Sequence, residues 1–332
     1  MVRTLVVERF LMMNRRRMLA ALVGGALATA TPFAAAADGP LRVVASFSVL
    51  GDMVKEIGGK HVSLATIVGP NGDAHSFEPT PRDVQALSQA QLLVINGLDF
   101  EGWLPRLIKA ADFEGAQVLA SKGIAPRHLS DAKHADAHTA HEKHHEDDAG
   151  HDHHGDVDPH AWQSLTNGII YAENIAEGLS LADPEHRSDY KERAEVYIAQ
   201  MKKLDAEIRQ AFDAIPRNKR KVITSHDAFG YFAQDYGIQF LSVAGFSSQA
   251  EPSARDVAAI VDRAKKEGIA GVFIENTTNA KLVEQIARET KATVGGTLYS
   301  DALASPDQPA STYLGMFSWN AGQLLYVLKP MQ

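Results

Sequence analysis

Hydrophobic positions along the chain predict strands that alternate with short helices. From residue 41 onward, short apolar runs recur between stretches whose apolar positions repeat with helical spacing. The runs that predict strands cover residues 41–47, 61–68, 92–96, 116–120, 222–225, 239–243, 271–274 and 292–294. The helical stretches cover residues 49–57, 81–89, 101–111, 228–235, 255–267, 280–289 and 313–328. Because strands that alternate with helices form parallel βαβ units, we predict an α/β fold with two doubly wound parallel sheets.

Two longer helical segments separate these halves. Residues 166–179 predict one helix, and residues 183–214 predict a second, with Pro184 in its first turn. The second helix has a single apolar stripe, formed by Tyr190, Ala194, Tyr197, Met201, Leu204, Ile208 and Phe212. A helix of about 31 residues is roughly 46 Å long, enough to join two domains as a rigid backbone. We therefore expect an N-terminal α/β domain at 38–165, linking helices at 166–215 and a C-terminal α/β domain at 216–332.

The first 37 residues have the pattern of an export signal. Three arginines at 15–17 precede an uncharged, mostly apolar stretch at 18–30, and the small-residue run Ala34–Ala37 follows. A basic region, a short apolar region and an Ala-x-Ala site describe a cleaved secretory signal peptide, so we expect a periplasmic protein. The segment Asn14–Leu19 also resembles a twin-arginine signal, and an ordinary Sec signal is the alternative.

Composition narrows the chemistry that the chain can carry. The 33 Lys and Arg residues against 41 Asp and Glu residues give a net charge of −8, the wrong sign for a general nucleic-acid binder. The cysteine count is zero. This excludes disulfides, thiolate ligands, cysteine nucleophiles and lipid attachment through a processed N-terminal cysteine, so we expect release as a soluble protein. Any metal site must use imidazole and carboxylate groups.

Residues 128–158 interrupt the α/β pattern with an acidic, histidine-rich insertion. Almost nothing in this segment could be buried, so we predict a disordered loop. Eight of its histidines lie close together, at His134, His138, His141, His144, His145, His151, His153 and His154. Imidazoles at this spacing can gather transiently around a metal ion. We interpret the loop as an accessory site for metal capture; a solvated linker with incidental metal affinity is the alternative.

A small number of histidines outside the insertion occupy positions suited to a ligand site. His75 lies in the loop after the second predicted strand, and His226 directly follows the strand at 222–225. His160 opens the segment before the first linking helix, and Asp301 follows the last short strand. Because ligands bind beyond the carboxyl ends of parallel strands, these side chains are expected to converge in a cleft between the two domains.

Each of these residues also has an ordinary structural explanation. A single loop histidine is usually a surface or hydrogen-bonded residue, and Asp301 could cap the turn before Leu303. His61 and His186 retain that ordinary explanation, as a polar strand position and an exposed helix position. Three imidazoles and one carboxylate together suit Zn²⁺, whereas Mn²⁺ would be expected to recruit more oxygen ligands.

The segments around these residues resemble the zinc/manganese solute-binding proteins of ABC transporters. The segment Gly69–Pro81 is similar to that family's Pro-Gly-x-Asp-Pro-His-x-Tyr-Glu-Pro-Thr-Pro signature. Further similar blocks occur in the same order at Asn96–Leu104, Asp158–Trp162, Ser225–Phe229, Glu251–Ser253 and Ser300–Asp301. The resemblance extends from about Leu41 to the end of the chain.

This resemblance implies a ligand set and a metal. The family's ligand positions correspond to His75, His160, His226 and Asp301. Zinc importers of the family have histidine at the third position and manganese importers typically have glutamate, so His226 favours zinc. The chain departs from the family pattern at two places next to the ligands. Ala74 replaces the usual proline before His75, and Gln163–Leu165 replaces the common Leu-Asp-Pro after His160.

The implied function is binding and delivery rather than catalysis. We expect a monomer that captures zinc with high affinity in the periplasm and delivers it to the permease of an ABC importer; a periplasmic zinc chaperone is a further candidate partner. A manganese-binding member of the same family is the main alternative. A zinc hydrolase is less consistent with four protein ligands, because catalytic zinc usually keeps one position open. An adhesin or storage protein would depend on the histidine-rich loop instead.

Overall fold

The computed structural model describes residues 39–128, 157–243, 254–278 and 280–329. The chain divides into Met1–Asp38 and Gly39–Gln332, and all the described residues belong to the second unit. The predicted signal segment at 1–37 and the eight clustered histidines lie outside the described residues. Described residues do include the ends of the predicted insertion. His128 and Val157 form an antiparallel bridge and Asp158 is fully buried, so these three residues belong to the folded part of the chain.

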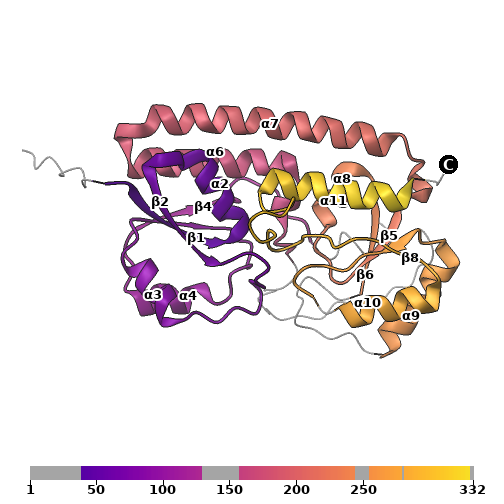
Figure 1. The fold of residues 1–332 in the computed structure, drawn as a ribbon. Coiled ribbons are helices and arrows are strands. Elements are labelled where there is room, and N and C mark those ends of the chain that lie inside the picture. Colours follow the sequence, from indigo (N-terminus) through magenta and orange to yellow (C-terminus); the bar gives the residue numbers. More distant parts are fainter. Residues whose placement is uncertain (1–38, 129–156, 244–253, 279, 330–332) are drawn as a thin grey trace, which may run out of the picture. The chain divides into compact units, whose positions relative to one another are not determined.

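The first sheet has four parallel strands in the order β2-β1-β3-β4. Its strands are β1 (Leu41–Phe47), β2 (Val62–Val68), β3 (Leu92–Ile95) and β4 (Ala116–Leu119). Its helices are α2 (Ser48–Gly58), α3 (Pro81–Ser88), α4 (Leu104–Ala111) and α6 (Leu165–Ala182). In Figure 1, α2 and α6 lie on one face of this sheet and α3 and α4 on the other, so the sheet is doubly wound.

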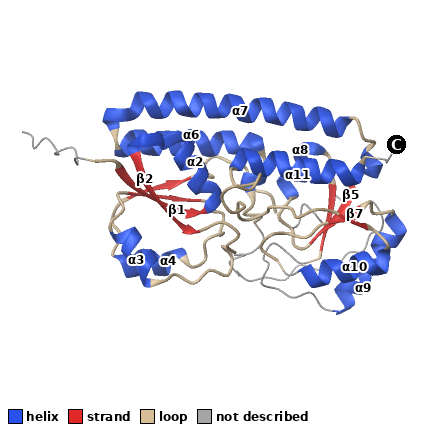
Figure 2. Ribbon diagram, viewed as in Figure 1, coloured by secondary structure: helices blue, strands red, loops and turns tan. Residues whose placement is uncertain are grey.

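The second sheet repeats this order as β6-β5-β7-β8, again with parallel strands. Its strands are β5 (Lys221–Thr224), β6 (Gln239–Ser242), β7 (Gly271–Val272) and β8 (Thr293–Val294). Its helices are α8 (Gly230–Tyr236), α9 (Ala254–Glu267), α10 (Ala280–Thr290) and α11 (Tyr313–Leu328). Figure 2 shows α9 and α10 together on one side of these strands and α8 and α11 on the other. The prediction of two doubly wound parallel sheets is confirmed.

Local sequence explains where these elements form. In β1 every residue except Arg42 is buried, which is typical of a central strand covered by helices on both faces. The helix α3 begins with Pro81 at its first position. Ahead of it, the Asp83 carboxylate accepts hydrogen bonds from the Thr80 backbone N–H at 2.8 Å and the Thr80 hydroxyl at 2.7 Å. These contacts satisfy backbone groups that the first turn leaves without partners.

The long linking helix is confirmed, although it begins later than expected. A short 3₁₀ turn, η3 (Pro184–His186), precedes α7 (Arg187–Asp213). The 27 residues of α7 span about 40 Å. Along this length α7 packs on α2 and α6 from the first half and on α8 and α11 from the second (Figure 1). All members of the predicted apolar stripe are buried except Leu204, which is partly buried.

Several predicted boundaries differ from the structure. The helix predicted at 101–111 begins only at Leu104, because the buried Glu101 carboxylate accepts hydrogen bonds from the backbone N–H groups of Asn96 and Gly97. The helix predicted from residue 228 begins at Gly230, after a turn in which the Ala228 N–H donates to the His226 carbonyl. The strands β7 and β8 have two residues each and are shorter than predicted.

The main hydrophobic core continues from one half of the chain to the other. It contains β1 residues such as Phe47, α7 residues such as Met201, and Phe232 and Phe317 from α8 and α11. A second, smaller cluster, which includes Ile223 and Val283, lies beneath the second sheet. The two halves are therefore joined by shared apolar packing as well as by the backbone.

None of the described helices combines the length and apolar character needed to cross a bilayer.

We expect the packing of α7 to be a major source of stability. Phe212 is fully buried, and its ring lies 6.2 Å from Phe232 and 5.9 Å from Tyr236, measured between centroids. Replacing Phe212 by alanine should lower the free energy of unfolding by about 3–5 kcal/mol through lost burial and the cavity left behind. The matched control is Val196→Ala on the same helix, because Val196 is 56% exposed. Its effect in denaturant-induced unfolding should stay within about 0.5 kcal/mol; equal effects of both variants would contradict the proposed role of the helix.

Candidate metal centre

Four segments that lie far apart in the sequence contribute side chains to one centre. His75 lies in the loop after β2, and His160 immediately precedes the 3₁₀ turn η2 (Ala161–Gln163). His226 follows β5, and Asp301 lies between β8 and α11. The strand order reverses direction between β1 and β3 and again between β5 and β7. Ligand sites of doubly wound folds form at such switch points, beyond the carboxyl ends of the strands.

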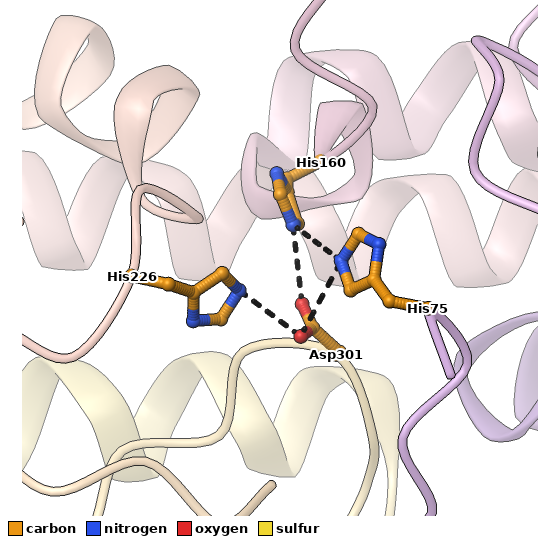
Figure 3. A group of neighbouring side chains, drawn as sticks. All are labelled: His75, His160, His226 and Asp301. Carbon is orange, nitrogen blue, oxygen red and sulfur yellow. Dashed lines mark hydrogen bonds and ion pairs between the residues drawn. The ribbon is translucent and has the colours of Figure 1, made fainter. Parts of the chain in front are cut away.

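The four side chains point toward one another, as Figure 3 shows. Each offers one ligand atom, and these atoms all lie within 4.8 Å of one another. The Asp301 carboxylate is central, at 3.1 Å from His226 Nε2, 3.4 Å from His160 Nε2 and 3.8 Å from His75 Nε2. The Nε2 atoms of His75 and His160 are 3.3 Å apart. One ion placed among these atoms could be bound by three imidazoles and one carboxylate, the donor set that suits Zn²⁺.

Burial distinguishes one of these residues from the other three. The side chains of His160, His226 and Asp301 are completely inaccessible to solvent, whereas the His75 side chain is 9% exposed. Nε2 of His226 and both carboxylate oxygens of Asp301 have no partner with hydrogen-bond geometry among the described residues, despite their short separations. Buried polar atoms without hydrogen bonds are costly, and a bound cation would satisfy them.

A buried carboxylate stands behind His160. The Asp158 side chain accepts hydrogen bonds from the His160 backbone N–H at 3.0 Å and from its Nδ1 at 2.8 Å. The Arg127 guanidinium donates to the other oxygen of Asp158 at 2.6 Å. A proton held on Nδ1 leaves Nε2 to face the centre as the ligand atom, so Asp158 sets both the tautomer and the orientation of the ring.

Glu275, three residues beyond the end of β7, has the same role behind His226. Its Oε1 accepts hydrogen bonds from the backbone N–H groups of Ser225 at 2.8 Å and His226 at 3.0 Å. Its Oε2 lies 2.6 Å from His226 Nδ1. Sequence analysis did not identify Asp158 or Glu275 as supporting residues. Their positions, two residues before a candidate ligand and just after a predicted strand, were the only available signals.

Two tryptophans and a glutamine fix the backbone next to the ligands. Trp162 Nε1 and Gln163 Nε2 both donate to the carbonyl of Ser300, at 2.9 and 2.6 Å, and so fix the segment before Asp301. Trp103 Nε1 donates to the carbonyl of Ala74 at 2.9 Å, next to His75. Gln163, which departs from the family pattern in the sequence, thus positions a neighbouring ligand segment in this chain.

The remaining sequence candidates lie elsewhere. The rings of His61 and His186 stack on each other with centroids 3.9 Å apart. Each contacts a carboxylate, Asp189 at 2.8 Å and Asp183 at 2.7 Å respectively. They contribute no atom to the centre. His61 ends the 3₁₀ turn η1 (Gly59–His61) and His186 ends η3, rather than occupying the strand and exposed helix positions expected of them.

The electrostatics of the centre favour protons on two of its imidazoles when no cation is bound. Burial lowers the pKa of His160, but the hydrogen bond to Asp158 and the negative charges of Asp158 and Asp301 outweigh it and raise the pKa to about 9. For His226 the charges of Glu275 and Asp301 likewise overcome burial and raise the pKa well above its ordinary value. The two imidazoles in turn hold the pKa of Asp301 well below normal, against the effect of burial. Burial lowers the pKa of His75 to about 4, so this ring is neutral.

Comparison with known proteins gives a consistent family assignment. The family model of the periplasmic zinc-uptake complex component A (ZnuA) matches residues 43–326. The metal ABC transporter substrate-binding lipoprotein FimA of Streptococcus parasanguinis is 29% identical over 310 residues, covering 92% of this chain and 94% of FimA. Other similar proteins are named for iron or for manganese.

Solved structures share the fold over most of the chain. The periplasmic zinc-binding protein TroA of Treponema pallidum has a TM-score of 0.76 and 26% identity, covering 88% of this chain and 100% of TroA. A mutant, manganese-bound periplasmic metal-binding protein of Candidatus Liberibacter asiaticus has a TM-score of 0.73 and 29% identity, covering 86% of this chain and 99% of that protein.

Metal binding to this centre should be strongly dependent on pH. A metal requires neutral imidazoles, whereas His160, with a pKa of about 9, carries a proton at pH 7 in the metal-free protein. Each proton released on binding makes the apparent affinity rise by about tenfold per pH unit while that group is protonated. We therefore expect affinity to increase from pH 6 to pH 8. Calorimetry in two buffers with different heats of ionisation counts the protons; no release at pH 7, or constant affinity over this range, would contradict the assigned charge states.

Proposed function

The chain belongs to the family of the periplasmic zinc-uptake complex component A, and we propose on this basis that it captures zinc and delivers it to an ABC importer. The family consists of metal-binding components of ABC transporters. We propose His75, His160, His226 and Asp301 as the ligands of one tight site. The main observation in favour is that these four donor atoms, from four separate segments, lie within 4.8 Å of one another.

The donor set favours binding over catalysis. Four protein ligands complete the tetrahedral shell of zinc, whereas catalytic zinc usually has three and keeps a position for water. The buried carboxylate of Glu275 lies behind His226 and contacts its Nδ1 atom, so it does not act as a general base facing an open metal position. The arrangement therefore fits an ion that is held, carried and released intact.

The choice of zinc rests on the third ligand. His226 makes the donor set nitrogen-rich, and imidazole suits zinc better than it suits manganese. Similar proteins are variously named for zinc, manganese or iron, so the donor set of this chain carries the argument. The carboxylates behind His160 and His226 are the kind of supporting groups that increase the basicity of ligating imidazoles.

Competitive loading tests the metal and the site together. With equal concentrations of Zn²⁺ and Mn²⁺ and less protein than metal, we expect zinc to exceed manganese by at least about tenfold in elemental analysis, following the general affinity order for divalent ions. Predominant manganese would contradict the proposal. The variant His160→Ala should lose most of the metal bound at the tight site, because it removes a buried ligand. The matched control is His186→Ala, which removes a histidine outside the centre and should bind like the wild type.

We further propose that the histidine-rich segment assists capture when zinc is scarce. Binding to such a segment must also order the chain, so its affinity should fall below that of the preorganised centre. Deleting residues 131–156 should leave one tight site, lower the total zinc stoichiometry and slow loading from a competing chelator. A variant in which the eight clustered histidines become serine keeps the length and should behave in the same way. Loss of the tight site on deletion would show that the four proposed ligands are insufficient.

We propose that the protein acts in the periplasm after removal of residues 1–37, as a monomer that meets the importer's permease. Several similar proteins are named lipoproteins, whereas the 332 residues of this chain contain no cysteine that could carry a lipid. A periplasmic zinc chaperone remains a candidate second partner.

A further inference from the structure

One exposed asparagine connects the loop of His75 to the segments of the other half. The Asn71 backbone N–H donates to the carbonyl of Leu303 at 2.9 Å. Its side-chain Nδ2 donates to Ser305 Oγ at 3.1 Å, and its Oδ1 accepts a hydrogen bond from Asn276 Nδ2 at 3.1 Å. Three hydrogen bonds from a single residue therefore bridge segments more than 200 positions apart in the chain.

All three partners lie next to residues of the metal centre. Leu303 and Ser305 follow Asp301 by two and four positions, and Asn276 is adjacent to Glu275. Asn276 Nδ2 also contacts the carbonyl of Ala302 at 3.2 Å, so the same amide group holds the Asp301 segment from a second direction. Asn71 thus joins the loop of His75 to the segment that follows Asp301. It also joins this loop to Asn276, the neighbour of Glu275, which supports His226.

The loop between Asn71 and His75 is stiff enough to transmit this restraint. The Gly72 N–H donates to the carbonyl of Gly69 at 3.1 Å, which closes a turn. The Asp73 carboxylate then accepts hydrogen bonds from the His75 backbone N–H at 2.8 Å and from the Ser76 hydroxyl at 2.6 Å. Asn71 itself has a φ of 56°, a left-handed conformation that asparagine tolerates better than most residues. A displacement of Asn71 must therefore move His75.

His75 is also the ligand nearest to solvent, since the other three side chains are inaccessible. A bound ion leaves most directly past His75, which requires the loop at 69–76 to move away from Asp301. We propose that Asn71 is a latch whose hydrogen bonds to the second half set the rate of metal release. The inference rests on the proposed function in that the centre binds metal. Because Asn71 is exposed, a docking permease can reach the latch directly.

The variant Asn71→Gly tests the latch. Glycine keeps the left-handed backbone and the N–H bond to Leu303, and it removes both side-chain hydrogen bonds. Stopped-flow transfer of Zn²⁺ from the loaded full chain to saturating EDTA should become about tenfold faster, the effect expected for one or two net hydrogen bonds. The association rate and the absorption spectrum of the Co²⁺-substituted centre should not change, because the four ligands remain in place.

Two further variants separate the latch from a general effect of glycine. Asp112 is another exposed residue with a left-handed conformation, at φ 47°, but it ends α4 away from the centre. Asp112→Gly should release zinc at the wild-type rate. Ser305→Ala removes one latch bond and should accelerate release by a smaller factor. Added to Asn71→Gly, it should have no further effect, because the bond it removes is already lost.

Hydrogen exchange of the metal-free protein tests the latch without any metal. Asn71→Gly should speed exchange in peptides that cover residues 69–76 and 301–305, and Asp112→Gly should not. Unchanged release and unchanged exchange in Asn71→Gly would overturn the proposal, and so would an altered Co²⁺ spectrum, which would mean that Asn71 shapes the centre itself. If the wild type bound no metal while exchange still increased, the proposed function and the role in metal release would both fail, and only the restraint of the His75 loop by Asn71 would stand.

Discussion

Buried carboxylates that must be matched by positive charge are the constraint on which this structure depends. Asp301 is completely buried among three imidazoles, and Asp158 and Glu275 are buried behind two of them. Arg127 pairs with Asp158 at 2.6 Å, so three carboxylates and one guanidinium leave two negative charges. An unmatched charge in a protein interior is costly. One divalent cation removes this cost, and so do two protons on the imidazoles, as the raised pKa values of His160 and His226 indicate. Metal binding is in this sense an exchange of one ion for two protons.

The fold makes this concentration of charge possible by supporting it from both sides. Each sheet directs loops beyond the carboxyl ends of its strands toward the centre, and backbone N–H groups at these loops neutralise part of the charge. Glu275 receives two such N–H groups, and Asp158 receives one. The shared core and the packing of α7 hold the two sets of loops in fixed positions relative to each other. Neither half contains all four ligands, so the centre exists only because the halves are packed together.

The four residues of the candidate centre could be selected from the sequence because each has a local signal. His75 and His226 follow apolar strands, and a parallel sheet places the residues after its strands at one edge. Asp301 follows a predicted short strand and His160 opens the segment before a predicted helix, and the resemblance to a known family supported all four positions. Supporting contacts were harder, since Glu275 is 49 residues from His226 and Asn276 is 205 residues from Asn71. Such pairs form through tertiary packing, which cannot be predicted from the periodicity of apolar residues or from the spacing of motifs in the sequence. The start of α4 was misjudged for a related reason, because the Glu101 side chain binds the backbone N–H groups of Asn96 and Gly97 and is thereby held in the turn before the helix.

A centre that encloses its ion must also release it, and the structure restricts how this can happen. Separating the halves would divide the continuous core that includes Phe47, Phe232 and Phe317, and each large apolar side chain exposed in this way would cost about 1.5–3 kcal/mol. The loop of His75 is attached differently, by exposed polar contacts for which water can substitute. Buried contacts such as Trp162 to Ser300 have no such replacement, so the Asp301 segment stays fixed, whereas the loop of His75 keeps one buried contact, from Trp103 to Ala74 within its own half. Release is therefore a local event at one ligand, and a permease needs to act only on the surface near His75.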